Sequence, residues 1–487
     1  MSKSQDNPNK QSLSEDQAKS ILADYGIPVV KEAGCKTINE AVKAAGKMGF
    51  PVVLKGLGEK LLHKTEMGAV ALNLNNAEAV ESAAKKIAQK TGDLLEGYLV
   101  QQQVSGKREF VTGMFRDQQF GPVILLGIGG VLTEALSDFT LRIAPLTKTD
   151  VSEMISEIKA NKLFAEFRGD KAVNLSQLED TLLGLSKLCL EQEDIAEIDI
   201  NPLIADSDGN LTAVDALIIK ETSNTKSQFL PPINPIVIDH FFQPDNIAFI
   251  GASGTVGKWG YNLPMNTISG KFEGDVYLVN PKGGKIAGKE VYKSIGDIPG
   301  DIDLAVVTIP AAMVLDAIPE LKKKNTRSIL LITSGFGETG EDGKALELEL
   351  VKQAREAGIL VLGPNTMGIC NPHSHLYCMG VHVQPPAGNT AIVSQSGNMG
   401  VQLLAFALQQ GIGIRGFCGS GNEAMLTIED FLDAFKLDPL TETVVIYMES
   451  VKNGRRFFES AQKVTQKKPI ILLKGGQSSA GNLAASS

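Results

Sequence analysis

An apolar run that leads into a glycine loop restricts this chain to α/β folds. The stretch NIAFIGASGTVGKWG begins as a β-type segment at residue 246 and continues into Gly251, Gly254 and Gly257. Glycines in such a loop let backbone N–H groups close on a pyrophosphate at the N-terminus of the next helix. Two later runs, LAVVTIP and SILLITSGF, resemble buried parallel strands, and we expect a helix before each. The pattern predicts a doubly wound sheet.

The residues after the second predicted strand indicate which ligand this loop would bind. A dinucleotide site needs an acid there to hold the ribose hydroxyls. This chain has VYLVNPKGG instead, which places Asn280 and Lys282 in that region. Lysine favours a phosphorylated ligand, such as the 3'-phospho-ADP part of coenzyme A (CoA), so CoA is preferred over NAD. A glycine turn required only for tight packing would give the same loop sequence.

The N-terminal part pairs a lysine with a nearby histidine. In PVVLKGLGEKLLHKTEMGAVALNL, an apolar strand carries Lys55 and the following loop carries His63. Lysine neutralises nucleotide phosphates as a compact charge, and histidine accepts a phosphoryl group near neutral pH. The pair therefore predicts phosphoryl transfer, with ordinary solvated or structural side chains as the alternative.

A predicted hairpin follows two helical stretches over residues 150–193. In EIDINPLIADSDGNLTAVDALI, the Asp-Gly-Asn turn folds two strands together, so Asn201 and Asp215 are expected on a common face. Oxygen ligands on paired strands suit Mg²⁺, which retains waters and binds nucleotide phosphates. A solvated Asn-Pro turn and an acid at a strand end are the alternative.

The C-terminal third contains a second candidate anion site. After residue 389, a β-type run meets Ser394, Ser396 and Gly397 at the start of an amphipathic helix. Free amides and the helix dipole there would stabilise a phosphate or phosphohistidine. An ordinary serine N-cap would have the same sequence. Residues 13–25 and 38–48 also have helical periodicity, and the proline-rich stretch 222–235 is interpreted as a linker.

Composition excludes several classes of protein. At 487 residues the chain should hold about three domains. A formal net charge of -9 with scattered lysines argues against nucleic-acid binding. We expect a cytoplasmic protein, because neither a signal peptide nor a run long enough to span a bilayer is evident. The five cysteines are expected to be reduced thiols, and CNPHSHLYC (370–378) could hold zinc by ligand type alone.

Most of the chain resembles the NDP-forming acyl-CoA synthetases, relatives of succinyl-CoA synthetase, and in particular their acetate–CoA ligase branch. The matching motifs are YGIPV, PVVLK, LLHKTEMGAV, FGPVILLGIGGVLTEALSDFTLRIAPL, EIDINPL, GASGTVG, VNPKG, VVTIP, TSGFGETG and GPNTMGICNP. The resemblance implies an ATP-grasp domain at 1–222 and a linker at 223–235. A Rossmann-like CoA-binding domain at 236–372 and a flavodoxin-like α/β ligase domain at 373–487 would follow.

The resemblance implies an ADP-forming acyl-CoA synthetase that uses ATP, Mg²⁺ and CoA through acyl phosphate and phosphohistidine. It assigns phosphate relay to His63, support of a phosphohistidine to Glu449, nucleotide binding to Lys55, Glu109 and Glu197, and magnesium to Asn201 and Asp215. CoA would be bound by Gly251, Ser253, Gly254, Thr255, Gly257, Asn280, Lys282, Ser334 and Gly335, and phosphate by Ser394, Ser396 and Gly397. No metal is expected at 370–378, so zinc is not favoured.

The sequence departs from the family pattern at several points. Thr366 stands where a cysteine is usual, which excludes a thiol role there, and Met425 and Thr427 stand where acids are common. The family's second histidine would follow Ser487, so we expect a fragment, a truncation or one half of a noncovalent pair. Open alternatives are a ligand-sensing part of a protein acetyltransferase and a succinate-type ligase. Acetate, 3-hydroxypropionate and 4-hydroxybutyrate remain candidate acids.

Overall fold

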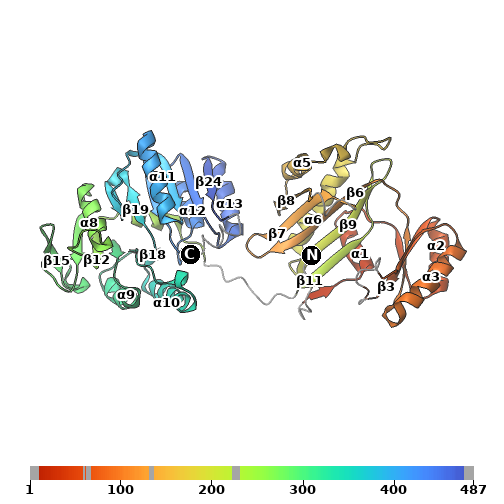
Figure 1. The fold of residues 1–487 in the computed structure, drawn as a ribbon, viewed down its shortest axis with the longest axis horizontal. Helices are drawn as coiled ribbons and strands as arrows, with labels where there is room; N and C mark the ends of the chain where they lie inside the picture. The colour runs from red at the N-terminus through yellow and green to blue at the C-terminus, as the bar shows by residue number, and fades with distance from the viewer. Residues whose placement is uncertain (1–9, 59–60, 62–66, 131–136, 222–230, 477–487) are drawn as a thin grey trace. The chain divides into compact units, whose positions relative to one another are not determined.

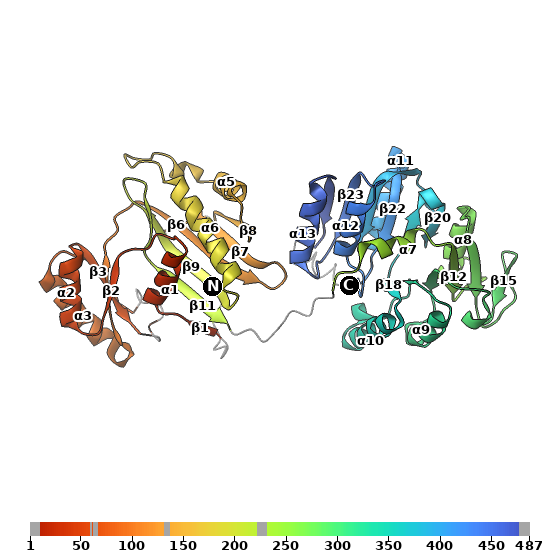
Figure 2. The same cartoon turned by 180° about the vertical axis from the view of Figure 1, so that it is seen from behind.

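The computed structural model describes residues 10–58, 61, 67–130, 137–221 and 231–476. The chain forms two compact units, residues 1–227 (unit 1) and 228–487 (unit 2) (Figures 1 and 2). His63, part of the predicted linker and the chain after residue 476 lie outside the described residues. No described helix combines the length and hydropathy that a bilayer span requires.

The described strands of unit 1 form two sheets, and all of their pairs are antiparallel. The larger sheet has the spatial order β1 (Lys10–Ser12), β11 (Ala216–Glu221), β9 (Ile195–Ala205), β6 (Arg108–Asp117), β7 (Gly121–Ile128) and β8 (Phe139–Ile143), with β10 (Leu211–Ala213) beside β9. The smaller has the order β2 (Glu32–Cys35), β5 (Gly97–Gln102), β3 (Val52–Leu57) and β4 (Val70–Leu74). The predicted hairpin is confirmed, because β9 pairs with β10 and β11 across the turn.

Helices cover both sheets of unit 1. Helices α5 (Lys148–Glu157) and α6 (Leu175–Glu191) contact the larger sheet, and α2 (Ile38–Met48) and α3 (Ala77–Thr91) contact the smaller one. Helix α1 (Glu15–Asp24) lies between the two sheets in both views (Figures 1 and 2). At the start of α1 the Ser14 N–H donates to Gln17 Oε1 at 3.2 Å, and Glu15 in the first turn is buried.

Unit 2 begins with the predicted doubly wound sheet. Its spatial order is β14 (Lys285–Ile286), β15 (Lys289–Tyr292), β13 (Asp275–Val279), β12 (Asn246–Ile250), β16 (Leu304–Val307), β17 (Ser328–Leu331) and β18 (Leu360–Leu362). Strands β13, β12, β16, β17 and β18 are parallel. The helices of this part are α7 (Asp239–Phe242), α8 (Trp259–Ser269), α9 (Val314–Lys323) and α10 (Glu341–Ala357).

The expectation of a helix before both buried strands is half wrong. Helix α9 precedes β17, but β16 follows the β14–β15 hairpin and a single 3₁₀ turn, Ile295–Asp297. Three glycines with positive φ, Gly283, Gly284 and Gly288, shape this hairpin. Glycine favours turns over helices, which explains why the connection does not form a helix.

A second sheet completes unit 2. Its order is β20 (Leu376–Met379), β19 (Gly368–Asn371), β22 (Ile414–Gly419), β21 (Ala387–Ser394), β23 (Thr443–Met448) and β24 (Ile470–Lys474). The helices here are α11 (Gly397–Gln410), α12 (Ile428–Leu437) and α13 (Gly454–Thr465). One hydrophobic core includes Phe249 of β12, Phe431 of α12 and Ile446 of β23, so the two sheets of unit 2 pack together.

Candidate active site

Lys55 is buried where the two sheets of unit 1 approach each other. It lies on β3, and its Nζ is 2.5 Å from Glu15 Oε1 and donates to the Val214 carbonyl at 3.3 Å. Asp215 Oδ2 is 3.7 Å away. A buried lysine requires such partners, because an unpaired ammonium is costly outside water. The predicted nucleotide lysine is therefore held beside one of the predicted magnesium ligands.

The hairpin places Asn201 and Asp215 opposite each other. Ala216 pairs with Ile200, and the Asn201 N–H donates to the Asp215 carbonyl at 3.3 Å. Because side chains alternate along a strand, Asn201 shares a face of β9 with Glu197 and Asp199. Burial, followed by the charges of Glu197 and Asp215, raises the pKa of Asp199 to about 6. This face therefore concentrates negative charge, which suits a divalent cation.

Glu109 lies on β6, where it pairs with Ile204 of β9. Its carbonyl accepts from the Gly129 N–H at 2.7 Å, and a Cβ added to Gly130 would lie 3.4 Å from its Oε2. The carboxylate therefore borders the Gly129–Gly130 turn. His63, the predicted phosphate carrier, lies outside the described residues.

In unit 2 the glycine loop leaves the carboxyl end of β12 in the predicted manner. Gly251 and Gly257 have φ values of +96° and +88°, a region that favours glycine. The Gly251 and Ala252 N–H groups both donate to the Val279 carbonyl. Ser253 Oγ accepts from the Thr255 N–H at 3.1 Å, which fixes the turn.

Gly260 is a requirement of this loop that was not predicted from the sequence. A Cβ at Gly260 would lie 2.2 Å from the Gly251 carbonyl oxygen, whereas a Cβ at Gly254 would meet nothing within 4 Å. Close packing of α8 against the loop therefore depends on Gly260. The sequence signal that could have indicated this contact is the position of Gly260, nine residues after Gly251.

Gly260→Ala should destabilise unit 2 by about 2–4 kcal/mol, because overpacking against backbone forces the helix to shift. Denaturant unfolding followed by the fluorescence of Trp259, the only tryptophan, measures this effect. Gly254→Ala is the matched control and should change stability by less than about 1 kcal/mol. Equal losses in the two variants would contradict the packing role.

The other predicted CoA residues flank the same edge of the sheet. Asn280 follows β13, and its Nδ2 donates to the Ala252 carbonyl at 2.8 Å. Its Oδ1 accepts from the N–H of Lys282, whose side chain is exposed. Asn280 thus braces the glycine loop while Lys282 faces solvent.

Ser334 and Gly335 follow β17 at that edge. The Gly335 N–H donates to Glu338 Oε1 at 2.5 Å, and the Phe336 N–H donates to Oε2 at 3.2 Å. Although burial opposes it, these donors and Asn422 lower the pKa of Glu338. The Glu338 carboxylate therefore accepts from the N–H of Gly335, one of the residues predicted to bind CoA.

The second predicted anion site joins two neighbouring parallel strands. Ser394 ends β21 beside Tyr447 of β23, and Ser396 caps α11, which begins at Gly397. Gln395 Oε1 accepts from the N–H groups of Glu449 at 2.7 Å and Ser450 at 3.0 Å. Gln395, which was not predicted from the sequence, therefore brings the serine loop and Glu449 together.

A buried acid lies near this loop. Glu423 is 2% exposed, has φ +56° and accepts from Ser420 Oγ at 2.7 Å. Burial is the main cause that raises its pKa to about 8, and Glu429 adds to the shift. The raised pKa favours the protonated form of Glu423 at neutral pH, unlike that of an ordinary glutamate.

The cysteine and histidine loop does not form a zinc site in the part of the chain that the structure describes. Cys370 pairs with Tyr377 and Cys378 with Ile369, so the two thiols point to opposite faces of the β19–β20 hairpin. They belong to separate hydrophobic cores. All five cysteines are buried thiols outside any disulfide, as predicted.

Thr366 is buried and donates to the Gly419 carbonyl, which is a structural role.

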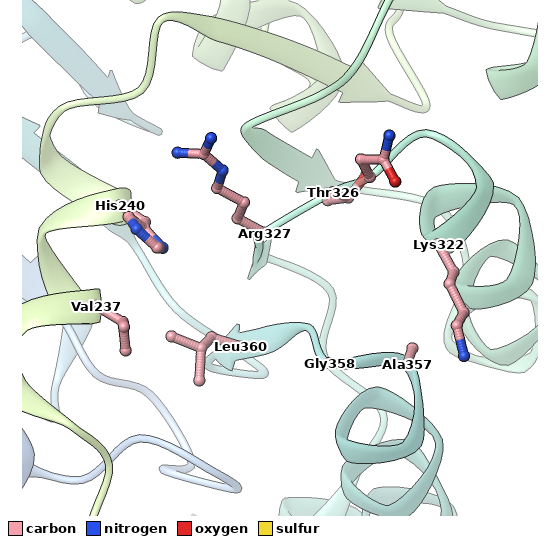
Figure 3. Close-up of a pocket in the computed structure, with 9 residues that line it drawn as sticks. Val237, His240, Lys322, Thr326, Arg327, Ala357, Gly358 and Leu360 are labelled. Atoms are coloured by element: carbon pink, nitrogen blue, oxygen red, sulfur yellow. The ribbon is translucent and has the colours of Figure 1, made fainter.

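A cavity of about 510 Å³ lies in unit 2, and Figure 3 shows the residues that line it. It is lined by His240 of α7, by Thr326 and Arg327 before β17, and by Gly358 and Leu360 at the start of β18. These positions are at the amino ends of parallel strands, whereas the glycine loop is at their carboxyl ends. The cavity is therefore separate from the candidate CoA site.

Three family models match this chain in the predicted order. An ATP-grasp domain matches residues 5–219, a CoA binding domain matches 245–372, and a succinyl-CoA ligase like flavodoxin domain matches 387–487. These matches confirm the predicted fold classes. The exact domain boundaries remain predictions.

Curated relatives match over most or half of the chain. ADP-forming acetate–CoA ligase II of Archaeoglobus fulgidus is 34% identical over 98% of this chain and 69% of its own length. The α subunit of the Pyrococcus furiosus ADP-forming acetate–CoA ligase I is 41% identical over 51% of this chain and 55% of its own. The β subunit of the same enzyme is 41% identical over 42% of this chain and 91% of its own.

Proposed function

Since the chain belongs to the family of ADP-forming acyl-CoA synthetases, we propose that unit 1 binds ATP with Mg²⁺ and unit 2 binds CoA. The reaction would convert a carboxylic acid, ATP and CoA to acyl-CoA, ADP and phosphate. The observation that carries the proposal is the ammonium of Lys55 beside the Asn201–Asp215 end of the hairpin. A fixed cation next to oxygen ligands is the arrangement that a magnesium nucleotide requires.

Lys55 would bind nucleotide phosphates, with Glu109 and Glu197 lining the nucleotide site. Asn201 and Asp215 would hold Mg²⁺, and the raised pKa of Asp199 supports this assignment because a cation would relieve the crowded negative charge. Bound Mg²⁺ would bridge phosphate oxygens and neutralise charge on the transferred group.

His63 would carry the phosphoryl group. A ring nitrogen attacks the γ-phosphorus of ATP, the new P–N bond forms, and the bond to the ADP oxygen breaks. Transfer of the phosphoryl group to a carboxylate oxygen of the acid would form an O–P bond, break the P–N bond and give an acyl phosphate. Attack of the CoA thiolate on the acyl carbon would then form the thioester and release phosphate. Glu449 would orient a phosphohistidine ring, and the loop of Ser394, Ser396 and Gly397 would bind its phosphate.

CoA would bind at the carboxyl edge of the first sheet in unit 2. The glycine loop of Gly251, Ser253, Gly254, Thr255 and Gly257 would receive the pyrophosphate, and Lys282 would pair with the 3'-phosphate. Asn280 supports this loop through Ala252. Ser334 and Gly335 would contact the ligand after the Glu338 carboxylate moves away from the N–H groups of Gly335 and Phe336. A short carboxylic or hydroxycarboxylic acid would be the acyl substrate, and the protein would act as an oligomer.

Asp215→Asn should raise the Mg²⁺ concentration needed for half-maximal ADP binding by about tenfold, because one anionic ligand is lost. Calorimetric titration of ADP at several magnesium concentrations measures this. Asp208→Asn, an exposed acid in the same hairpin paired with Lys171, is the control and should have no effect. An unchanged magnesium dependence in Asp215→Asn would exclude Asp215 as a ligand.

A further inference from the structure

The ammonium of Lys55 belongs to a buried chain of charges that extends away from the proposed nucleotide site. Glu15 Oε1 accepts from Lys55 Nζ at 2.5 Å and from Lys19 Nζ at 2.8 Å. The side chains of Glu15, Lys19 and Lys55 are 3%, 2% and 7% exposed. Two cations therefore share one carboxylate oxygen in an almost fully buried cluster.

The chain of charges continues to a second carboxylate. Lys19 Nζ is 2.8 Å from Glu32 Oε2, and Gln101 Nε2 donates to the same oxygen at 3.2 Å. Gln101 Nε2 also donates to the Val214 carbonyl at 2.8 Å, the acceptor that Lys55 uses. The network therefore joins α1, β2, β3 and β5. Its two ends meet at the carbonyl of Val214, the residue before Asp215.

A contribution to folding stability does not by itself explain such a network. Buried ion pairs often contribute no more than apolar side chains of the same size, because each charge loses its hydration. Their better supported value is to fix one arrangement of charged groups. Here the fixed group is the end of a flexible lysine side chain.

We propose that Glu15 and Lys19 are positioning residues that set both the place and the effective charge of Lys55. Glu15 anchors the ammonium, and Lys19 draws on the same carboxylate oxygen, so that Glu15 does not fully neutralise Lys55. Two lysines and two glutamates, Glu15 and Glu32, sum to zero charge. Loss of Lys19 would leave the cluster with a net charge of -1 behind the nucleotide phosphates.

This inference rests on the proposed role of Lys55 and predicts effects of opposite sign. Lys19→Met should raise the Kd for magnesium ADP about tenfold, because the uncompensated carboxylates then neutralise the Lys55 ammonium and weaken its contact with phosphate. Adding Glu32→Gln to Lys19→Met restores zero net charge and should return the Kd to within about threefold of wild type. The double variant also avoids an unpaired buried charge, so it remains testable if the single variant folds poorly.

Titration calorimetry at mildly alkaline pH measures these constants, because burial raises the pKa of Glu32 and its charge must be present. Lys85→Met, which breaks an exposed pair with Glu81, is the control and should leave the Kd unchanged. A merely structural role predicts that the double variant binds no better than Lys19→Met, and that result would overturn the proposal.

Measurements in a Lys55→Met background distinguish the positioning role of Lys19 from the proposed role of Lys55 in nucleotide binding. There, Lys19→Met should have little further effect on the Kd, because its influence acts through Lys55. An equal tenfold effect in both backgrounds would overturn the positioning role alone. Unchanged binding in Lys55→Met itself would instead contradict the proposed function.

Discussion

Lys55→Met is expected to raise the Kd for magnesium ADP by about 100-fold. Removing the ammonium deletes a charge-assisted contact to phosphate in a buried setting, a loss of about 3 kcal/mol. Glu15 keeps Lys19 as a partner in this variant, so the fold should survive. Calorimetric titration with ADP and excess magnesium gives the constant directly.

Two comparisons make this expectation specific to unit 1. Lys282→Met removes an exposed lysine of unit 2 and should leave ADP binding unchanged while weakening CoA binding. Lys55→Met should do the reverse. If both variants weakened both ligands equally, the assignment of nucleotide and CoA to separate units would be wrong.

Because of the raised pKa of Glu423, the free energy of unfolding of unit 2 should fall as the pH rises toward 8. Its folded pKa of about 8 exceeds the ordinary value of 4.5. Between these values the folded state holds a proton that the unfolded chain has released, so stability falls by up to about 1.4 kcal/mol per pH unit. The stabilisation that protonated Glu423 provides is fully present below the ordinary pKa and is lost as the pH rises through about 8.

Glu423→Gln isolates this contribution. The amide does not titrate, so the variant should gain stability relative to wild type as pH rises from about 5 to about 8. Urea unfolding followed by Trp259 fluorescence reports on unit 2. Glu459→Gln, a half-exposed acid paired with Arg455, is the control and should follow the wild-type pH profile. Parallel profiles for wild type and Glu423→Gln would show that Glu423 is not protonated in the folded state.

Features set by local pattern were predictable from the sequence. Strand alternation and a short turn fix the register of the hairpin, which is why Asn201 and Asp215 could be paired before the fold was known. The glycine loop after β12 was equally clear, because positive φ at Gly251 restricts the residue type.

Features made by long-range packing were not predictable. Glu15 is 40 positions from Lys55, and no periodicity relates them. The opposite faces of Cys370 and Cys378 depend on hairpin register, which composition alone does not give. Likewise, the Glu338 carboxylate that occupies the Gly335 amide became visible only with the loop in three dimensions.

The exchange of label between ADP and ATP tests the central claim most directly. Incubated with magnesium, ATP and labelled ADP but no acid or CoA, the protein should move label into ATP, because phosphoryl transfer to His63 is reversible. His63→Asn should abolish the exchange while ADP still binds. Exchange that persists at the wild-type rate in His63→Asn would contradict a phosphoryl carrier at His63 and the account built on it.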